Sequence, residues 1–133
     1  MGAVDPLVRE ILAGEPSLAW FGFTVDEAVS GRAVASTQVG PEHVNANGMA
    51  HGGFVFALAD QAFAMAATTV LHFSATADAQ IHYLAPAHVG QRLVATAQTS
   101  WHDGRRAVVD VIVTADGDVI ATYSGMARAV RRT

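Results

Sequence analysis

The residues best suited to chemistry lie together in the stretch NANGMAHGGFVFALADQAFAMAA, which runs from Asn45 to Ala67. A loop rich in glycine, asparagine and histidine leads there into an almost wholly apolar segment that holds one acid, Asp60. An ionised carboxylate in apolar surroundings is costly unless it is paired or hydrogen-bonded. The residues three and four positions from Asp60 are all apolar. Asp60 is therefore a candidate functional acid rather than a surface residue.

The His-Gly-Gly sequence before this segment predicts a second functional group. The first N–H groups of a helix have no intrahelical partner, and the helix dipole favours negative charge at that end. Gly52 and Gly53 carry no side chain that would block approach, so an oxygen that gains charge during a reaction could dock on their amides. The alternative is that the two glycines only permit a tight turn into the helix.

The spacing of these two groups predicts a dimer. Gly52 and Asp60 are eight positions apart, which is about 12 Å along a straight helix. An oxyanion donor and an attacking group must both lie about 3 Å from one reacting centre. One chain cannot easily meet this condition, whereas two antiparallel helices related by a two-fold axis can. We therefore expect an obligate C2 dimer with two composite sites.

The elements that must position these residues are one long helix and a set of strands. The segment 53–71 is rich in alanine and free of internal glycine and proline, which predicts a helix, and its apolar character on every side predicts burial. Asp-Gly turns between alternating runs predict hairpins after it. The expected strands form an antiparallel meander over residues 78–87, 92–101, 106–114 and 119–130.

The N-terminal part predicts a short helix and a hairpin. Asp5 can cap a helix that has Pro6 at its first position and ends at Gly14. Residues 20–39 then read as strand, with a turn at Ser30-Gly31. Residues 1–133 are thus expected to form a single α+β domain in which an antiparallel sheet wraps one central helix.

Composition restricts the class of function. The 133 residues carry a net charge of −4, so a nucleic-acid partner is not expected. The absence of cysteine excludes disulfides and thiolate chemistry, and the histidines lack metal-ligand spacing, so no metal is expected. An acid at a bilayer centre costs roughly 2.5–3.5 kcal/mol, which argues against a membrane span at Asp60. The N-terminus has no signal-peptide pattern, and we expect a cytoplasmic protein.

Three motifs together carry a family resemblance. Asn45 lies six residues before His51, Asp60 lies eight residues after Gly52, and a Tyr-Leu-x-Pro sequence occupies positions 83–86. With these motifs, the chain from about Gly22 to Arg128 resembles the hotdog-fold acyl-CoA thioesterases of the PaaI-like group, which belongs to the phenylacetate pathway. The resemblance implies a long helix wrapped by an antiparallel sheet, in a homodimer that often pairs into a tetramer.

The resemblance also implies roles for individual residues. Asp60 corresponds to the family's general base or nucleophile, and Gly52 to the residue whose amide polarises the thioester carbonyl. Asn45 is expected to position the attacking water or the leaving sulfur, and His51 to shape the loop and the oxyanion site. A strand hydroxyl that assists the acid aligns best with Thr76, although Ser74 is close to the same position.

The expected substrate is an acyl-CoA thioester, with a (hydroxy)phenylacetyl, related aromatic or medium-chain acyl group and no separate cofactor. Gly53, Arg105 and Arg106 are candidates for binding the CoA part, since arginine suits phosphates, with Arg128, Arg131 and Arg132 as weaker candidates. Two alternatives stay open. One is a non-catalytic acyl-CoA-binding module. The other is a hotdog dehydratase or hydratase, against which the absence of a histidine inside the central helix counts.

Overall fold

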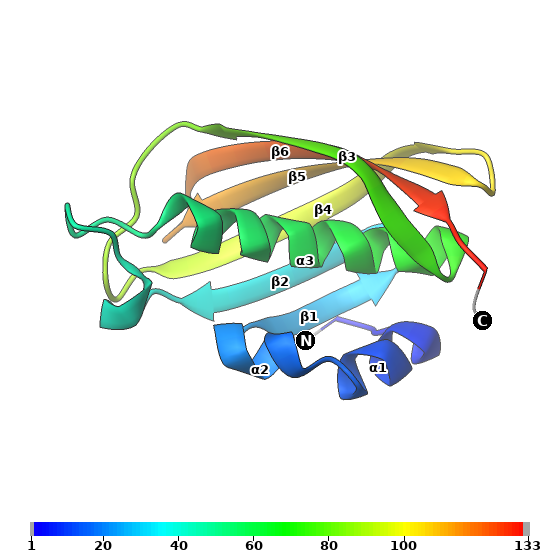
Figure 1. Ribbon diagram of the computed structural model, residues 1–133, viewed down its shortest axis with the longest axis horizontal. Helices are drawn as coiled ribbons and strands as arrows, with labels where there is room; N and C mark the ends of the chain where they lie inside the picture. The colour runs from blue at the N-terminus through cyan, green and yellow to red at the C-terminus, as the bar shows by residue number, and fades with distance from the viewer. Residues whose placement is uncertain (1, 132–133) are drawn as a thin grey trace.

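The computed structural model describes residues 2–131 as a six-stranded antiparallel sheet curled around one long helix (Figure 1). This confirms the predicted α+β class. The elements in chain order are α1 (Pro6–Ala13), α2 (Pro16–Phe21), β1 (Thr24–Val29), β2 (Arg32–Gln38), the 3-10 turn η1 (Pro41–His43), α3 (Gly52–Leu71), β3 (Ser74–Tyr83), β4 (Arg92–His102), β5 (Arg106–Ala115) and β6 (Asp118–Ala129).

The two N-terminal helices lie beside β1 (Figure 1). Helix α1 has the predicted ends, because the Asp5 side chain accepts a hydrogen bond from the backbone N–H of Leu7 and Gly14 forms the C-cap. Helix α2 corrects the prediction that the strand begins at Trp20. Its proline at the first turn and its left-handed Gly22, at φ 76°, are the start and stop signals of a short helix.

Helix α3 is the core of the fold. It is long and apolar enough to span a membrane, but most of it is buried inside this domain. Its buried residues face β2, β4 and β5 as well as β3 and β6. A helix that is apolar on nearly every side needs this kind of cover, and the curled sheet supplies it.

The strand order is β1-β2-β4-β5-β6-β3. The prediction of a simple meander is therefore correct for β4, β5 and β6 and wrong for β3, which pairs with β6 rather than with its sequence neighbour β4. Strand β3 also begins at Ser74, four residues before the predicted start. The Asp-Gly turn between β5 and β6 has positive φ at both Asp116 and Gly117, as hairpin geometry requires.

The two edges of the sheet differ in how they are protected. The N-terminal segment covers the edge at β1, since Val4 forms a bridge with Ala28 and the Asp5 N–H donates to the Ala28 carbonyl at 2.7 Å. Strand β3 forms the other edge, and all of its residues except Ser74 and Ile81 are exposed. An open edge of ten residues is a template for pairing with another strand.

Candidate active site

Asp60 lies in the middle of α3 and is half-buried. Its Oδ1 atom accepts a hydrogen bond of 3.0 Å from the hydroxyl of Tyr123, on β6. This tyrosine is only 2% exposed, and its ring packs against Phe56 and Phe63 with centroid distances of 5.4 and 5.5 Å. The lone acid thus has the polar partner that its apolar surroundings require.

Burial and the hydrogen bond act on Asp60 in opposite directions. Desolvation raises the pKa of the Asp60 carboxyl above its ordinary value, and the hydrogen bond from Tyr123 offsets part of this rise. Burial raises the pKa of the Tyr123 phenol too, helped by the negative charges of Asp60 and Asp78. Tyr123 therefore stays protonated as a donor, and Asp60 has the raised pKa that suits a general base.

The N-terminus of α3 offers one free amide. His51 is the N-cap, and its Nδ1 atom accepts a hydrogen bond of 2.9 Å from the backbone N–H of Gly53. The N–H groups of Phe54 and Val55 both bond to the His51 carbonyl. Among residues 2–131 the N–H of Gly52 has no acceptor. The structure thus separates the two glycines: the Gly52 amide is available to a ligand, whereas the Gly53 amide is already satisfied.

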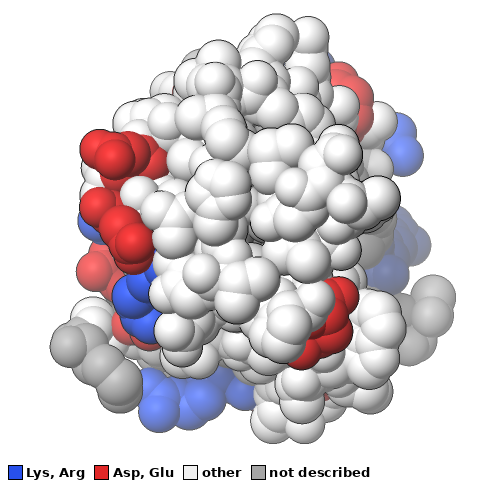
Figure 2. All heavy atoms as spheres, turned by 90° about the vertical axis from the view of Figure 1, so that its left-hand side faces the viewer, with Lys and Arg blue, Asp and Glu red and all other residues white. Residues whose placement is uncertain are grey.

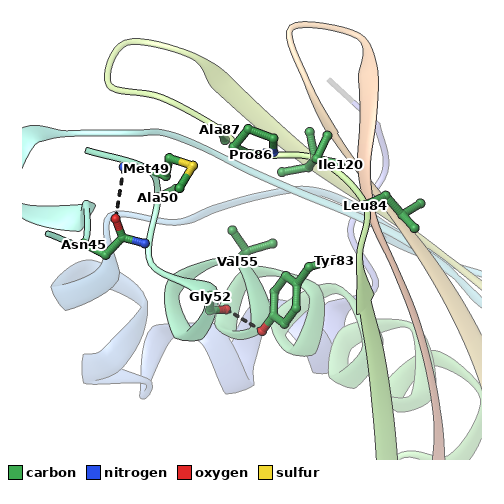
Figure 3. Close-up of a pocket in the computed structure, with 11 residues that line it drawn as sticks. Asn45, Met49, Ala50, Gly52, Val55, Tyr83, Leu84, Pro86, Ala87 and Ile120 are labelled. Carbon is green, nitrogen blue, oxygen red and sulfur yellow. Dashed lines mark hydrogen bonds between the residues drawn. The ribbon is translucent and has the colours of Figure 1, made fainter. Parts of the chain in front are cut away.

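Tyr83 holds this helix end from the side of the sheet. Its hydroxyl donates a hydrogen bond of 2.8 Å to the Gly52 carbonyl, which Figure 3 shows as a dashed line. A Cβ atom at position 52 would lie 3.2 Å from the Tyr83 ring, so glycine is favoured there by close contact as well as by its open amide.

Asn45 organises the loop that precedes the helix. Its Oδ1 atom accepts hydrogen bonds from the backbone N–H groups of Asn47, at 2.9 Å, and Met49, at 3.2 Å. The Asn45 side-chain NH₂ has no acceptor within the described part of the chain, and it is directed toward the segment that leads to Gly52 (Figure 3). The oxygen therefore shapes the loop, and the nitrogen remains able to donate to a ligand.

A cavity of about 380 Å³ lies beside Gly52. Its walls are mainly aliphatic, and Asn45 and Tyr83 add polar groups to them (Figure 3). The end of the molecule that holds this loop and the N-terminus of α3 presents a broad uncharged surface (Figure 2). The lining residues are Asn45, Met49, Ala50, Gly52, Val55, Tyr83, Leu84, Ala85, Pro86, Ala87 and Ile120.

Asp60 is not among the residues that line this cavity. It lies eight residues further along α3 than Gly52, about 12 Å along the axis. The single chain therefore brings together Asn45, His51 and Gly52 but leaves the acid apart from them. Thr76 is exposed on β3 and Ser74 is half-buried, and neither hydroxyl forms a hydrogen bond with Asp60 within residues 2–131.

The described arginines that were expected to bind CoA lie at the opposite end of α3. A hollow of about 610 Å³ beside the β4–β5 turn is lined by Arg105, Arg106, Arg128 and Arg131, together with Asp103. Arg106 pairs with Asp103 at 2.9 Å, and the backbone N–H groups of Arg106 and Arg105 lower the pKa of that carboxyl to about 2. The hollow carries an excess of positive charge. Arg132 lies outside the described residues.

Residues 2–131 contain no group of three or more His, Asp or Glu side chains that could hold a metal ion. Two contacts at the candidate site were not predicted from the sequence: Tyr83 with Gly52, and Tyr123 with Asp60. Alternation along β6 could have placed Tyr123 on the face toward the helix. Its pairing with Asp60 could not be read from the sequence, because it joins residues 63 positions apart.

A long central helix inside a curled antiparallel sheet, with an open amide at the helix start and a half-buried acid within it, defines a hotdog-fold domain. The family model of the thioesterase superfamily matches residues 47–122, more than half of the chain. The chain belongs to the thioesterase superfamily, and the predicted family and fold are confirmed.

Two curated relatives differ in their described roles. The acyl-coenzyme A thioesterase PaaI of Escherichia coli is 29% identical over 113 residues, covering 84% of this chain and 81% of the relative. The transcription factor FapR of Shouchella clausii is 36% identical over 104 residues, covering 77% of this chain and 53% of the relative. The chain spans about half the length of two of the curated relatives that it matches, 47% and 53%.

Solved structures agree with this fold. A variant of the phenylacetic acid degradation protein PaaI from Thermus thermophilus superimposes with a TM-score of 0.84 at 31% identity, covering 87% of this chain and all of that one. PaaI of Escherichia coli gives 0.90 at 23% identity, covering 98% and 99%. A Streptococcus mutans protein bound to acetyl-CoA gives 0.78 at 24% identity, covering 83% and 90%.

Proposed function

We propose that this domain is an acyl-CoA thioesterase. The observation that carries the proposal is the pair of groups on α3: a Gly52 amide left free beside a cavity, and a half-buried Asp60 whose carboxyl has a raised pKa. Thioester hydrolysis needs a donor for the carbonyl oxygen and a base or nucleophile for the carbonyl carbon. The PaaI relative is a thioesterase by name, which supports the same reaction.

In the proposed reaction the Gly52 N–H donates to the thioester carbonyl oxygen and stabilises the charge that develops on it. Asp60 takes a proton from a water molecule as that water adds to the carbonyl carbon, or attacks the carbon itself. When Asp60 acts as the base, the carbon–sulfur bond of the adduct then breaks, and the leaving thiolate takes the proton that Asp60 received. When Asp60 is the nucleophile, departure of the thiolate leaves an acyl-Asp60 anhydride; water hydrolyses this anhydride to the free acid and the Asp60 carboxylate, and the proton that is released goes to the thiolate. Asn45 directs its free NH₂ group toward the water or the sulfur, and His51 fixes the helix start through its cap.

The site is proposed to be shared between two chains. Pairing of the exposed β3 edges about a two-fold axis would continue the sheet and set the two α3 helices antiparallel. The Gly52 end of one helix would then approach Asp60 of the other. Thr76, exposed on the same edge, would enter the interface beside the acid. Pairing of two such dimers into a tetramer, and a cytoplasmic location, are parts of the same proposal.

The proposed substrate has two halves that suit the two ends of the molecule. In this proposal the aliphatic cavity beside Gly52 would hold a (hydroxy)phenylacetyl, related aromatic or medium-chain acyl group. The arginine hollow lies at the other end of its own α3, so in an antiparallel dimer it would serve the partner's site and hold the CoA phosphates. The acetyl-CoA in the Streptococcus mutans protein supports this ligand class.

A non-catalytic acyl-CoA-binding role is the second candidate, and the match to FapR, which is named as a transcription factor and not as an enzyme, is the observation that favours a non-catalytic role. Such a module would retain the cavity and the arginine hollow but would release no thiol. The two functions therefore differ in turnover and not in binding.

The test is thiol release from a panel of aromatic and aliphatic acyl-CoAs by the wild type and by Asp60→Asn. The chain has no cysteine, so a thiol-reactive dye reports only the product. We expect release by the wild type and a loss of most of kcat in the variant, with the dimer intact. Binding of acyl-CoA without release by the wild type would favour the binding module. A variant with unchanged kcat and a raised KM would refute the catalytic role of Asp60.

A further inference from the structure

Tyr123 lies on β6, the strand next to the edge strand β3, directly behind the acid of α3. On β6 it pairs with Val111 of β5 on one side and with Ile81 of β3 on the other. Residues Ala121 and Ala127 on the same strand are also fully buried. A position of this kind favours an apolar side chain, because each buried polar atom needs a partner. A phenylalanine would fill the same space without that requirement.

The hydroxyl of Tyr123 has one described partner, the Oδ1 atom of Asp60 at 3.0 Å. The ring is held on two sides, by Phe56 in a T-shaped contact and by Phe63 in a tilted one. Close packing of this kind leaves the ring one orientation. Phe63 itself packs against the backbone of β6 at Gly125, where a Cβ atom would lie 2.8 Å from the Phe63 ring. The hydroxyl is therefore fixed relative to the helix.

Asp60 Oδ1 is occupied by this bond, whereas Oδ2 has no donor within residues 2–131. We infer that Tyr123 is a positioning residue for the proposed hydrolysis: it holds Oδ1 of Asp60, so that Oδ2 is the oxygen presented to the water or to the thioester. This inference rests on the proposed function. It assigns different roles to the two oxygens of the same carboxylate.

The hydrogen bond has an electrostatic consequence as well. It favours the ionised carboxylate, in opposition to desolvation, which raises the pKa of Asp60. Among the described residues, Asp78 on β3 also acts on this pair, because its negative charge, like that of Asp60, raises the pKa of Tyr123. Removal of the hydroxyl would raise the pKa of Asp60 further. The base form would then appear only at higher pH.

Tyr123→Phe tests the inference, because it removes one oxygen and keeps the buried ring. We expect kcat to fall by about tenfold, the size of one hydrogen bond to a charged group, with KM little changed. The acidic limb of the kcat/KM profile should move to higher pH. In an Asp60→Asn background the same change should have no further effect on the residual rate.

Val111→Ala is the matched control, since it loosens the core beside Tyr123 on β5 and leaves both rings that hold the tyrosine unchanged. We expect it to lower the melting temperature without moving the acidic limb. An unchanged kcat and an unchanged limb in Tyr123→Phe would overturn the inference. A limb that moves equally in Val111→Ala would also overturn it, because general loosening would then explain the effect.

Carboxyl-carbon NMR separates this inference from the proposed function. The titration of Asp60 should move to higher pH in Tyr123→Phe whether or not the protein hydrolyses thioesters. In the wild type, the Tyr123 hydroxyl proton should be protected from exchange, and this protection should be lost in Asp60→Ala. That second measurement does not depend on the folding of the tyrosine variant. Unchanged titration together with an unprotected hydroxyl would refute the contact itself, and with it the positioning role.

Discussion

Replacement of Gly52 by proline should remove the oxyanion donor and leave the helix start intact. Gly52 is the first residue of α3 and its N–H is unpaired among the described residues, so the loss of that N–H breaks no internal hydrogen bond. Proline is well tolerated at the first helical position, and α1 and α2 of this chain both begin with proline. His51 has φ −60° and ψ 136°, a conformation that suits the residue before a proline.

The expected magnitude follows from the role of the amide. Loss of a single oxyanion donor costs about 2.7–4 kcal/mol of transition-state stabilisation, or roughly 10²- to 10³-fold in kcat. The added Cβ has a separate effect, because it would lie 3.2 Å from the Tyr83 ring. Gly52→Ala adds the same Cβ and keeps the N–H. The ratio of kcat between the alanine and proline variants therefore isolates the contribution of the amide.

The assay is thiol release at saturating acyl-CoA, with melting temperature and dimer mass measured for both variants. We expect the proline variant to be at least about a hundredfold slower than the alanine variant, with a smaller change in KM. Equal kcat values in two folded, dimeric variants would refute the assignment of the Gly52 amide. If both variants lose activity equally and Tyr83→Phe does as well, the contact between Tyr83 and the helix start matters instead of the N–H.

Two further predictions test the assembly and the CoA site. Equal amounts of Gly52→Pro and Asp60→Asn chains, allowed to exchange subunits, should regain about a quarter of wild-type activity, because random pairing makes half of the dimers mixed and each mixed dimer has one intact composite site of two. If mass spectrometry shows that the subunits have exchanged and no activity returns, shared sites are excluded. The double variant Arg105→Gln, Arg128→Gln should raise KM about tenfold for an acyl-CoA and leave KM unchanged for the acyl-pantetheine thioester, which lacks the nucleotide. Arg9→Gln on α1 is the control. An equal rise in KM for both substrates would show that the hollow does not bind the nucleotide.

The parts of the fold governed by local rules could be predicted from sequence. The cap at Asp5, the turn at Ser30-Gly31 and the Asp-Gly turn before β6 each depend on residues within a few positions of one another. Helix α2 was missed because Trp20 and Phe21 are typical of strands, although Pro16 and Gly22 mark the ends of a short helix. The early part of β3 was missed because its residues, SATA, have weak strand preference.

The candidate site, like the fold, could be predicted from the sequence only in part. The roles proposed for Asp60 and Gly52 follow from their types and their spacing along one helix. The distinction between the amides of Gly52 and Gly53 could not be predicted, since it depends on the rotamer of His51. The contacts of Tyr83 with Gly52 and of Tyr123 with Asp60 join residues 31 and 63 positions apart, and no local pattern encodes contacts of this range.

The open edge of β3 offers a way to inactivate the protein that does not compete with its substrate. A peptide with the sequence SATADAQIHY reproduces the ten residues of this strand, and an extended peptide can add to a free sheet edge through backbone hydrogen bonds. Such a peptide would occupy the edge through which the proposed dimer forms. Its inhibition would weaken as the protein concentration rises, and raising the acyl-CoA concentration would not relieve it.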